Sequence, residues 1–267
     1  MEDDGNWSDL RRSTVIAEDD AVLAINKPVG ISVMGERHET DIVRLAGDAG
    51  ETLYPVHRID KVTSGLVLFA KDLAVHGGLT RQFNKQTAEK AYLLITATVG
   101  LPPEGVIDLP LSAGRKGTVR IAAPRDRIRR DSQGSGAGRW SVASEDLLDT
   151  RMYPSVTRFA TLWSDDAYSV ILAEPVTGRR HQIRVHFAWI GHQILGDPLF
   201  DKAAAASGTR TCLHSFRLSL DAAWRDGERT DWEASPGVDF WAPLGDRLSV
   251  EAANSLINRA VRTRRAT

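Results

Sequence analysis

The chain has 267 residues, with 34 Lys and Arg against 35 Asp and Glu, a formal net charge of −1 and a single cysteine. A chain of this length buries roughly three-quarters of its unfolded surface, and its 42% of hydrophobic residues excludes disorder over most of the length. The lone Cys212 excludes an internal disulfide framework and a cysteine-rich zinc module, and no apolar run reaches the ~20 residues of a membrane helix.

The amino-terminal residues are acidic and lack an apolar core, so they do not form a secretory signal. We expect a flexible tail over residues 1–12, because short charged chain ends are usually poorly ordered. One folded domain is expected over 13–250, and a helix end with a basic tail over 251–267. The cysteine usage favours a reducing, cytoplasmic compartment, and we expect a monomer.

The hydrophobic periodicity predicts a mixed α and β chain. Runs rich in β-branched and apolar residues predict strands at Val15–Glu18, Val22–Asn26, Gly65–Ala70, Ala91–Thr98, Arg158–Leu162 and Tyr168–Glu174. Helical spacing predicts helices at Leu73–Lys85, at Gln182–Ile190 and from about Asp246 to Arg262. Turn-forming residues at 164–166 indicate a hairpin. Because βαβ units do not alternate regularly, one α+β domain fits best.

The charges are unevenly distributed along the chain. Residues 115–130 hold seven Lys and Arg against the single acid Asp126, and residues 176–192 hold three Arg and three His with no acid. The last ten residues carry four Arg, which we interpret as a solvated end. A net charge near zero can therefore conceal a positive face, which is the relevant quantity for binding nucleic acid.

Asp60 lies in a short polar segment directly before the strand predicted at Gly65–Ala70. A carboxylate in the loop before a core strand is well placed to face a cleft. Taken alone, the aspartate is explained more simply by an Asx-type turn.

Two further positions are candidates for a site. Arg184 lies within an amphipathic segment and could reach inward to keep a carboxylate ionised, although a surface helix with solvated arginines explains it equally. Tyr92 begins a strand and could stack on a base, but a lone tyrosine packs more often into the core. His181 and His186 are five residues apart, without an acid or cysteine nearby, which disfavours a zincin-like metal site.

Taken together, the chain resembles the RluA-type family of RNA pseudouridine synthases from about residue 14 to 250. The matching residues, in the family's order, are Ile25-Asn26-Lys27-Pro28 with Gly30, His57-Arg58-Ile59-Asp60 with Thr63-Ser64-Gly65, Lys90-Ala91-Tyr92, Thr177-Gly178-Arg179 with His181-Gln182-Ile183-Arg184-Val185-His186, Gly191-His192, Gly196-Asp197-Pro198-Leu199, Leu213-His214 and Ala242-Pro243-Leu244. No single motif identifies the family, but the ordered set is specific. The set therefore favours functional roles for Asp60, Tyr92 and Arg184, each of which has a simpler explanation when taken alone.

The resemblance implies a pseudouridine-synthase-like α+β fold with a mixed, mainly antiparallel sheet and flanking helices. It also implies that the protein isomerises a uridine in structured rRNA or tRNA, of which rRNA is favoured. The uridine would be flipped out of the RNA, and the reaction would need no cofactor or metal. The family's invariant aspartate corresponds to Asp60, its base-contacting tyrosine to Tyr92 and its aspartate-pairing arginine to Arg184. Arg58 corresponds to the arginine that holds the flipped nucleotide, and Leu213 to an apolar residue against the base.

The sequence departs from the family pattern at three places. Ile59 stands where leucine is usual, and Arg180 where threonine is commoner. Residues 113–155 are longer and richer in arginine than expected, so we interpret them as a variable insert that contributes to substrate choice. The pattern begins near residue 14, which leaves no room ahead of it for the S4 RNA-binding domain that many relatives carry.

Two other functions remain open on the sequence. An RNA-binding or RNA-chaperone protein could keep the fold without catalysis, but it would not need Asp60, Tyr92 and Arg184 together. A metal-dependent hydrolase using the histidines would lose its activity in the presence of a chelator.

Overall fold

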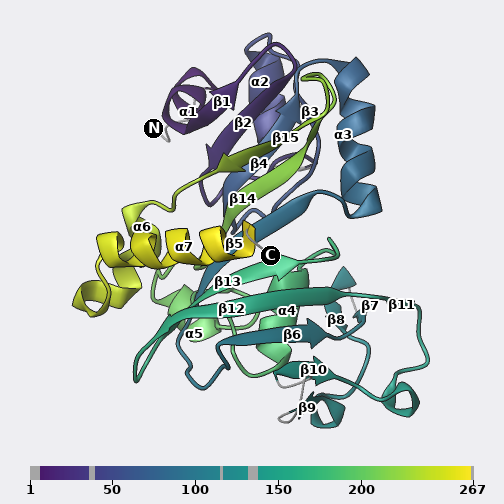
Figure 1. Cartoon of the computed structure of the whole chain (residues 1–267), viewed down its shortest axis with the longest axis vertical. Coiled ribbons are helices and arrows are strands. Elements are labelled where there is room, and N and C mark those ends of the chain that lie inside the picture. The colour runs from purple at the N-terminus through teal and green to yellow at the C-terminus, as the bar shows by residue number, and fades with distance from the viewer. Residues whose placement is uncertain (1–6, 36–39, 115–116, 132–137, 266–267) are drawn as a thin grey trace. The chain divides into compact units, whose positions relative to one another are not determined.

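The computed structural model describes residues 7–35, 40–114, 117–131 and 138–265 (Figure 1). The chain divides into two compact units, where we expected one domain. Unit 1 comprises Met1–Ala91 and Leu213–Pro236, and unit 2 comprises Tyr92–Cys212 and Gly237–Thr267. Each of the six predicted strands is present, and both units combine a mainly antiparallel sheet with helices, as expected for the α+β class.

Unit 1 contains a sheet in the order β1-β2-β4-β14, with β3 paired to β4 and β15 paired to β14. The strands are β1 (Val15–Glu18), β2 (Val22–Lys27), β3 (Tyr54–Pro55), β4 (Ser64–Ala70), β14 (Leu213–Ala222) and β15 (Glu228–Glu233). The β4–β14 pair is parallel, and the other pairs described in this unit are antiparallel. Every residue of β4 is buried, which explains its continuous apolar sequence and its central place.

Three helices belong to unit 1: α1 (Trp7–Thr14), α2 (Ile42–Asp48) and α3 (Leu73–Lys85). The Asp72 side chain caps α3 by accepting a hydrogen bond from the backbone N–H of Ala74. Gln86 ends this helix in the left-handed conformation. The prediction of a helix over these residues is confirmed. In Figure 1, α3 runs along the sheet of unit 1, where it contacts β4 and β14.

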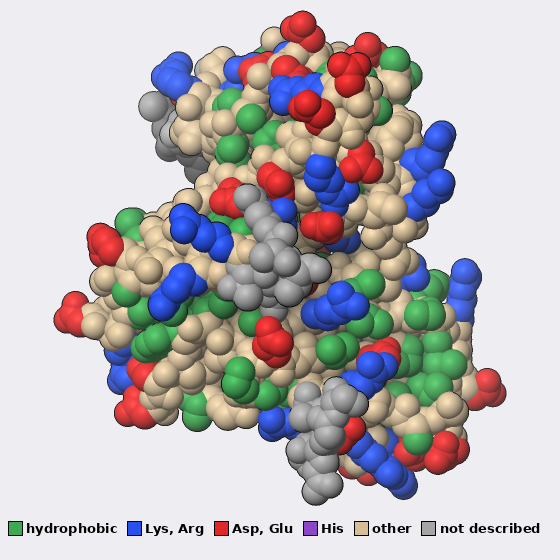
Figure 2. All heavy atoms as spheres, viewed as in Figure 1, with side chains coloured by type: hydrophobic (Ala, Val, Ile, Leu, Met, Phe, Trp, Pro, Cys, Tyr) green, Lys and Arg blue, Asp and Glu red, His purple; other side chains and the backbone are tan. Residues whose placement is uncertain are grey.

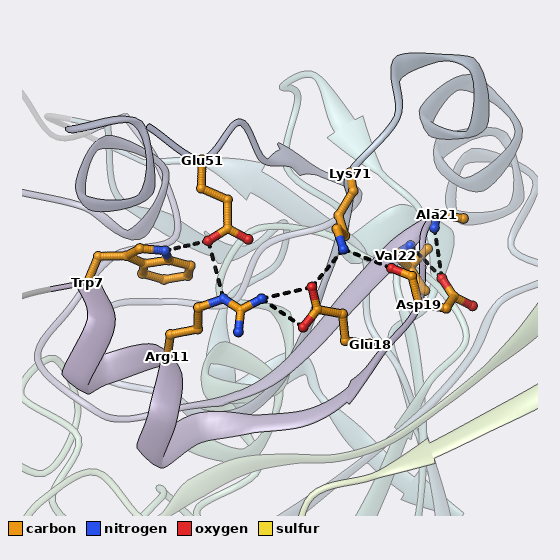
Figure 3. Close-up of polar contacts among 8 residues, drawn as sticks. All are labelled: Trp7, Arg11, Glu18, Asp19, Ala21, Val22, Glu51 and Lys71. Atoms are coloured by element: carbon orange, nitrogen blue, oxygen red, sulfur yellow. Dashed lines mark hydrogen bonds and ion pairs between the residues drawn. The ribbon is translucent and has the colours of Figure 1, made fainter. Parts of the chain in front are cut away.

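The amino-terminal helix α1 is attached to unit 1 by a network of polar contacts (Figure 3). Trp7 is 4% exposed, and its indole N–H donates to Glu51 at 2.6 Å. Arg11 joins Glu51 to Glu18, and Lys71 donates to Glu18 at 2.7 Å. The structure thus differs from the tail expected over residues 1–12. Residues 7–12 are helical because a buried tryptophan and paired charges hold them, and residues 1–6 lie outside the described residues.

Unit 2 contains a sheet in the order β5-β13-β12-β6-β10-β9 and a smaller one in the order β11-β7-β8. The strands are β5 (Glu89–Thr96), in which the unit boundary falls, β6 (Glu104–Asp108), β7 (Leu111–Ala113), β8 (Val119–Ile121), β9 (Arg129–Asp131), β10 (Arg139–Ser141), β11 (Met152–Tyr153), β12 (Val156–Ser164) and β13 (Ser169–Pro175). The predicted hairpin joins β12 to β13, because the Asp165 carboxylate accepts from the N–H groups of Ala167 and Tyr168.

Among its described residues, the insert expected over 113–155 includes the short strands β8 to β11 and the 3₁₀ turns Arg125–Arg127 and Ser144–Asp146. Short strands with little apolar sequence do not produce a period-2 signal, which is why the sequence did not predict them. Most of the loop expected at 131–138 lies outside the described residues.

The helices of unit 2 are α4 (Gln182–Trp189), α5 (Lys202–Ala206), α6 (Val238–Trp241) and α7 (Val250–Arg265). The last helix was expected from about Asp246, but it begins later. Residues up to Arg247 form a 3₁₀ segment that ends at the extended Leu248, and the Ser249 hydroxyl caps the new start by accepting from the Ala252 N–H. No helix in the described part of the chain is long and apolar enough to cross a membrane.

Candidate functional site

The candidate residues divide between the two units, and each half is described by itself. Arg58, Asp60 and Leu213 belong to unit 1, whereas Tyr92 and Arg184 belong to unit 2.

Asp60 is half-buried in the loop between β3 and β4, and backbone hydrogen bonds fix this loop. The Asp60 carbonyl accepts from the Thr63 N–H at 2.9 Å, which closes a turn directly before β4. The next carbonyl, that of Lys61, accepts from the Gly30 N–H at 2.9 Å. Arg58, two residues ahead of the aspartate, is exposed. The loop therefore carries a carboxylate on a fixed backbone with a cation close in sequence.

Lys27 is a fully buried ammonium at the end of β2, with 0% of its surface exposed. Its Nζ donates to the carbonyls of Pro28 at 2.7 Å, Ile31 at 2.8 Å and Lys61 at 3.4 Å. A buried cation is tolerated only when its donors are engaged, so this lysine ties the turn after β2 to the Asp60 loop. The sequence placed Lys27 in a family motif without assigning it a role.

His57 anchors the beginning of the same loop. Its ring stacks on Phe83 of α3 with centroids 4.8 Å apart, and its Nε2 accepts from the Leu68 N–H of β4 at 3.1 Å. Burial of the ring, followed by the positive charge of Lys90, lowers the pKa of His57 to about 3. The imidazole is therefore neutral near pH 7, which leaves Nε2 able to accept this hydrogen bond.

Leu213, at the start of β14, lies beside the end of the Asp60 loop. The parallel pairing places His214 opposite Ser64, so Leu213 is level with Thr63. The Ser64 hydroxyl and His214 Nδ1 are 2.8 Å apart, and His214 Nε2 lies 2.8 Å from the carbonyl of Ala234. Leu213 is 3% exposed, so an apolar side chain packs at the point where the carboxylate loop enters the sheet.

Gly65 permits the close approach of β4 and β14. Its φ is +107°, and a Cβ at this position would lie 2.2 Å from the carbonyl oxygen of Ser215. Only glycine combines this backbone conformation with this contact, which explains the Ser-Gly pair that follows the Asp60 loop.

In unit 2, Tyr92 lies on β5, opposite Ala173 of β13. It is half-buried, between the buried residues Ala91 and Leu93. A half-buried ring on a strand keeps part of its surface outside the core, which suits contact with a flat ligand.

The segment before α4 is joined to the sheet by buried polar side chains. The Gln182 amide accepts from the Thr177 hydroxyl at 2.7 Å and from the Arg179 N–H at 3.0 Å, and it donates to the Val156 carbonyl and the Thr157 hydroxyl. This arrangement gives Thr177 and Gln182 a structural role in the motif. It fixes the first turn of the helix that carries Arg184.

Arg184 points inward and has a carboxylate partner that we did not predict. Its Nε and Nη2 donate to the two carboxylate oxygens of Asp197, each at 2.7 Å. Arg184 is 4% exposed and Asp197 is fully buried. The interpretation of Arg184 as a solvated surface arginine is therefore wrong. The sequence offered one signal for this partner, an aspartate in a Gly-Asp-Pro turn. The number of residues between that turn and α4 did not show that the two side chains pair.

His186 faces the interior one turn before the end of α4. Its Nδ1 lies 2.9 Å from the Thr157 hydroxyl, and its Nε2 lies 3.0 Å from the Leu109 carbonyl. Burial lowers its pKa to about 4, although the hydrogen bond with Leu109 opposes this effect. Because both ring nitrogens are engaged, His186 is a core histidine that orients α4.

Each unit offers its own chemistry. Unit 1 presents a carboxylate on a fixed loop beside an apolar leucine, and unit 2 presents a tyrosine face and a buried arginine held by an aspartate. A carboxylate on a fixed loop can act as a general base or as a nucleophile, and a partly exposed tyrosine ring can stack on a base.

Comparisons with known proteins identify chains that are similar to this one. The family model described as RNA pseudouridylate synthase matches residues 21–189. The chain is 32% identical over 216 residues to tRNA pseudouridine synthase C of Pasteurella multocida, covering 76% of this chain and 84% of that protein. It is 32% identical over 215 residues to the dual-specificity RNA pseudouridine synthase RluA of Escherichia coli K12, covering 77% of this chain and 85% of that protein.

The fold is also found among solved structures. The human protein RNA Pseudouridylate Synthase Domain Containing 4 is similar with a TM-score of 0.69 and 24% identity, covering 89% of this chain and 94% of that chain. At this level of identity, the likeness supports the architecture described above.

Proposed function

The chain belongs to the RNA pseudouridylate synthase family and is therefore an isomerase that acts on RNA, and from that premise we propose that Asp60 is its catalytic carboxylate. The reaction breaks the bond between C1′ of the ribose and N1 of uracil, turns the base, and joins C1′ to C5. The hydrogen on C5 leaves as a proton and N1 takes up a proton, so no oxidant, reductant or second substrate is consumed.

Asp60 serves either as a nucleophile at C1′ or as a base that removes a proton from the sugar. Both roles need an ionised carboxylate at a fixed position. The observation that carries the proposal is the attachment of the Asp60 loop, whose backbone is held by the Gly30 N–H and the buried Lys27 ammonium. A loop held in this way keeps its carboxylate positioned through successive turnovers.

The other candidate residues serve the bound uridine in this proposal. The uridine is flipped out of the RNA stack at a cost of a few kcal/mol, and Arg58 holds the backbone beside the vacated position. Tyr92 and Leu213 provide the flat apolar surface that the uracil needs. Arg184, positioned by Asp197, takes the role that the family gives to the arginine serving the catalytic aspartate, which is to favour its ionised form.

The substrate in this proposal is a structured rRNA or tRNA, with rRNA tested first. Among the relatives, one is named for tRNA and another for dual specificity. We place the enzyme in the cytoplasm as a monomer. Mapping pseudouridine across total RNA from cells with and without the gene identifies the substrate directly, because a single lost site names both the RNA and the uridine.

The role of Asp60 is tested by release of tritium from RNA labelled at C5 of its uridines, using total RNA from cells that lack the enzyme. Asp60→Asn removes the charge and preserves the size of the side chain. We expect it to abolish release while binding of the same RNA stays within about twofold. Asp20→Asn, which changes an exposed carboxylate of the same unit, is the matched control and should retain full release. Tritium release by the Asp60→Asn enzyme at the normal rate would refute the assignment.

A further inference from the structure

Unit 2 contains a cavity lined by basic and aromatic side chains. Its volume is about 610 Å³, and it lies at the carboxyl end of α4. The residues that matter for its chemistry are Arg120 of β8, Arg125, Trp189, Gln193 and Phe200. Pockets of this size typically accept a single small ligand, and none of the residues that line this one is acidic.

One wall of the cavity is aromatic and held in place. The rings of Trp189 and Phe200 meet edge to face, with centroids 5.9 Å apart. The Arg125 guanidinium lies over the Trp189 ring at 5.7 Å and donates a hydrogen bond to the Ala188 carbonyl at the end of α4. Since a cation is favoured at a helix carboxyl end, Arg125 is held there and fixes the tryptophan. Both aromatic residues remain partly exposed.

Arg120 and Gln193 supply the polar groups of the cavity. Arg120 is exposed on β8 and makes no ion pair with any residue that the structure describes. Its guanidinium therefore gives the cavity an unneutralised positive charge, which suits a phosphate group. The Gln193 amide offers a donor and an acceptor, the pair of groups that recognises the edge of a base.

The cavity is connected to the Arg184 site through Asp197. The carboxylate that accepts both hydrogen bonds from Arg184 also accepts from the Leu199 N–H at 2.9 Å, and the Asp197 carbonyl accepts from the Phe200 N–H at 3.1 Å. The same aspartate thus orients the candidate active-site arginine and the wall of this cavity.

We propose that this cavity binds one unpaired nucleotide of the RNA substrate, other than the uridine that is isomerised. The base stacks on one of the two rings, Trp189 or Phe200, and meets the other at its edge, because the rings are nearly perpendicular. Its edge contacts Gln193, and its phosphate pairs with Arg120. A paired nucleotide is stacked within a duplex and does not present its face, so the cavity selects RNA with a flipped or single-stranded nucleotide. This inference rests on RNA being the substrate, and it is independent of the role proposed for Asp60.

The test compares two synthetic RNAs that share one stem: a hairpin with an unpaired loop, and a blunt duplex. Affinity is measured by fluorescence anisotropy for the wild type, for Arg120→Gln and for Arg158→Gln. Arg158 is an exposed arginine of β12, so the control removes the same charge from the same unit. We expect Arg120→Gln to weaken hairpin binding by roughly tenfold, the effect of losing a hydrogen bond between charged groups. Duplex binding should change by no more than in the control.

A second measurement, photocrosslinking, shows which residues contact the unpaired nucleotide. A hairpin carrying 5-iodouridine in its loop is irradiated with the wild-type protein, and the crosslinked peptides are sequenced. We expect a crosslink at Trp189 or Phe200, and its loss in Arg120→Gln.

Equal weakening of hairpin binding by Arg120→Gln and Arg158→Gln, or crosslinks that avoid both aromatic residues, would overturn the proposal. The Asp60→Asn enzyme distinguishes a failure of the nucleotide site from a failure of the function proposed above. It should bind the hairpin like the wild type and form the same crosslink while releasing no tritium. If instead it releases tritium, the role of Asp60 fails and the nucleotide site stands.

Discussion

Asp197 is the residue that makes a buried arginine possible in unit 2. A guanidinium in the interior is costly unless a counter-charge and hydrogen bonds satisfy it, and Asp197 supplies both through two oxygens at 2.7 Å. Its geometry leaves little rotational freedom to the arginine plane, because a bidentate contact fixes both position and orientation.

Asp197→Asn should therefore destabilise the protein by about 3 kcal/mol, because it leaves an unpaired charge in the interior. The measurement is the urea dependence of unfolding. Asp9→Asn breaks a surface pair whose partners are 69% and 78% exposed, and it should change stability by no more than about 0.5 kcal/mol. If the two variants unfold at the same urea concentration, Asp197 does not neutralise Arg184 in the folded state.

At the scale of the element, α4 is a helix whose inward polar residues matter as much as its apolar ones. The spacing of Ile183 and Phe187 predicted the helix correctly, but all residues from Gln182 to Ala188 are buried. Such a helix is stable because Gln182 and His186 direct their polar atoms to partners on the sheet.

The neutral state of His186 makes the stability of the protein depend on pH. Its pKa is about 4 in the folded state, against 6.5 as the ordinary value. Between these pH values, the unfolded chain binds more protons than the folded one. The contribution of His186 is therefore complete above pH 6.5 and declines as the pH falls, by about 1.4 kcal/mol per pH unit at most.

The contribution of His186 to the pH dependence of stability is isolated by measuring the unfolding free energy of the wild type and of His186→Gln between pH 7 and pH 4.5. Glutamine keeps a polar group in place and does not titrate. We expect the difference between the two proteins to be largest at pH 7 and to narrow as the pH falls. A constant difference across this range would show that His186 does not titrate differently on folding.

At the scale of the whole molecule, the balanced charge hides local basic segments. On the face drawn in Figure 2, Lys and Arg side chains stand among Asp and Glu side chains. Several arginines lie against aromatic rings, among them Arg130 over Trp140 at 5.0 Å and Arg151 over Tyr153 at 5.2 Å. Arginines spread over aromatic surfaces suit RNA, whose phosphates and bases they contact together.

RNA affinity should fall as salt increases, because each phosphate contact releases a counterion. Replacing Arg129 and Arg130 together with glutamine should reduce the slope of log affinity against log salt by about two, one for each contact. Binding of total tRNA measured at several salt concentrations checks this, with Arg158→Gln as the reference. An unchanged slope would mean that this segment does not touch RNA.

Much of the fold could be predicted because its signals are local. The strands β1 and β4 follow from short runs of apolar residues, and the helix α3 follows from a partial apolar stripe at helical spacing. The start of α7 was placed too early because the extended backbone of Leu248 separates a short 3₁₀ segment from the helix. The helical conformation of residues 7–12 was missed because the partner of Trp7 is Glu51, far along the chain.

The sequence by itself determined the family, the types of the main elements and the candidate residues, because ordered motifs and short-range periodicity are written along the chain. Only the tertiary structure decided which groups meet. Arg184 pairs with an aspartate 13 residues away, and Arg125 reaches a carbonyl 63 residues away to fix the wall of a cavity. Such contacts form only where the folded backbone brings distant side chains together. A local sequence pattern does not show which distant residues will meet.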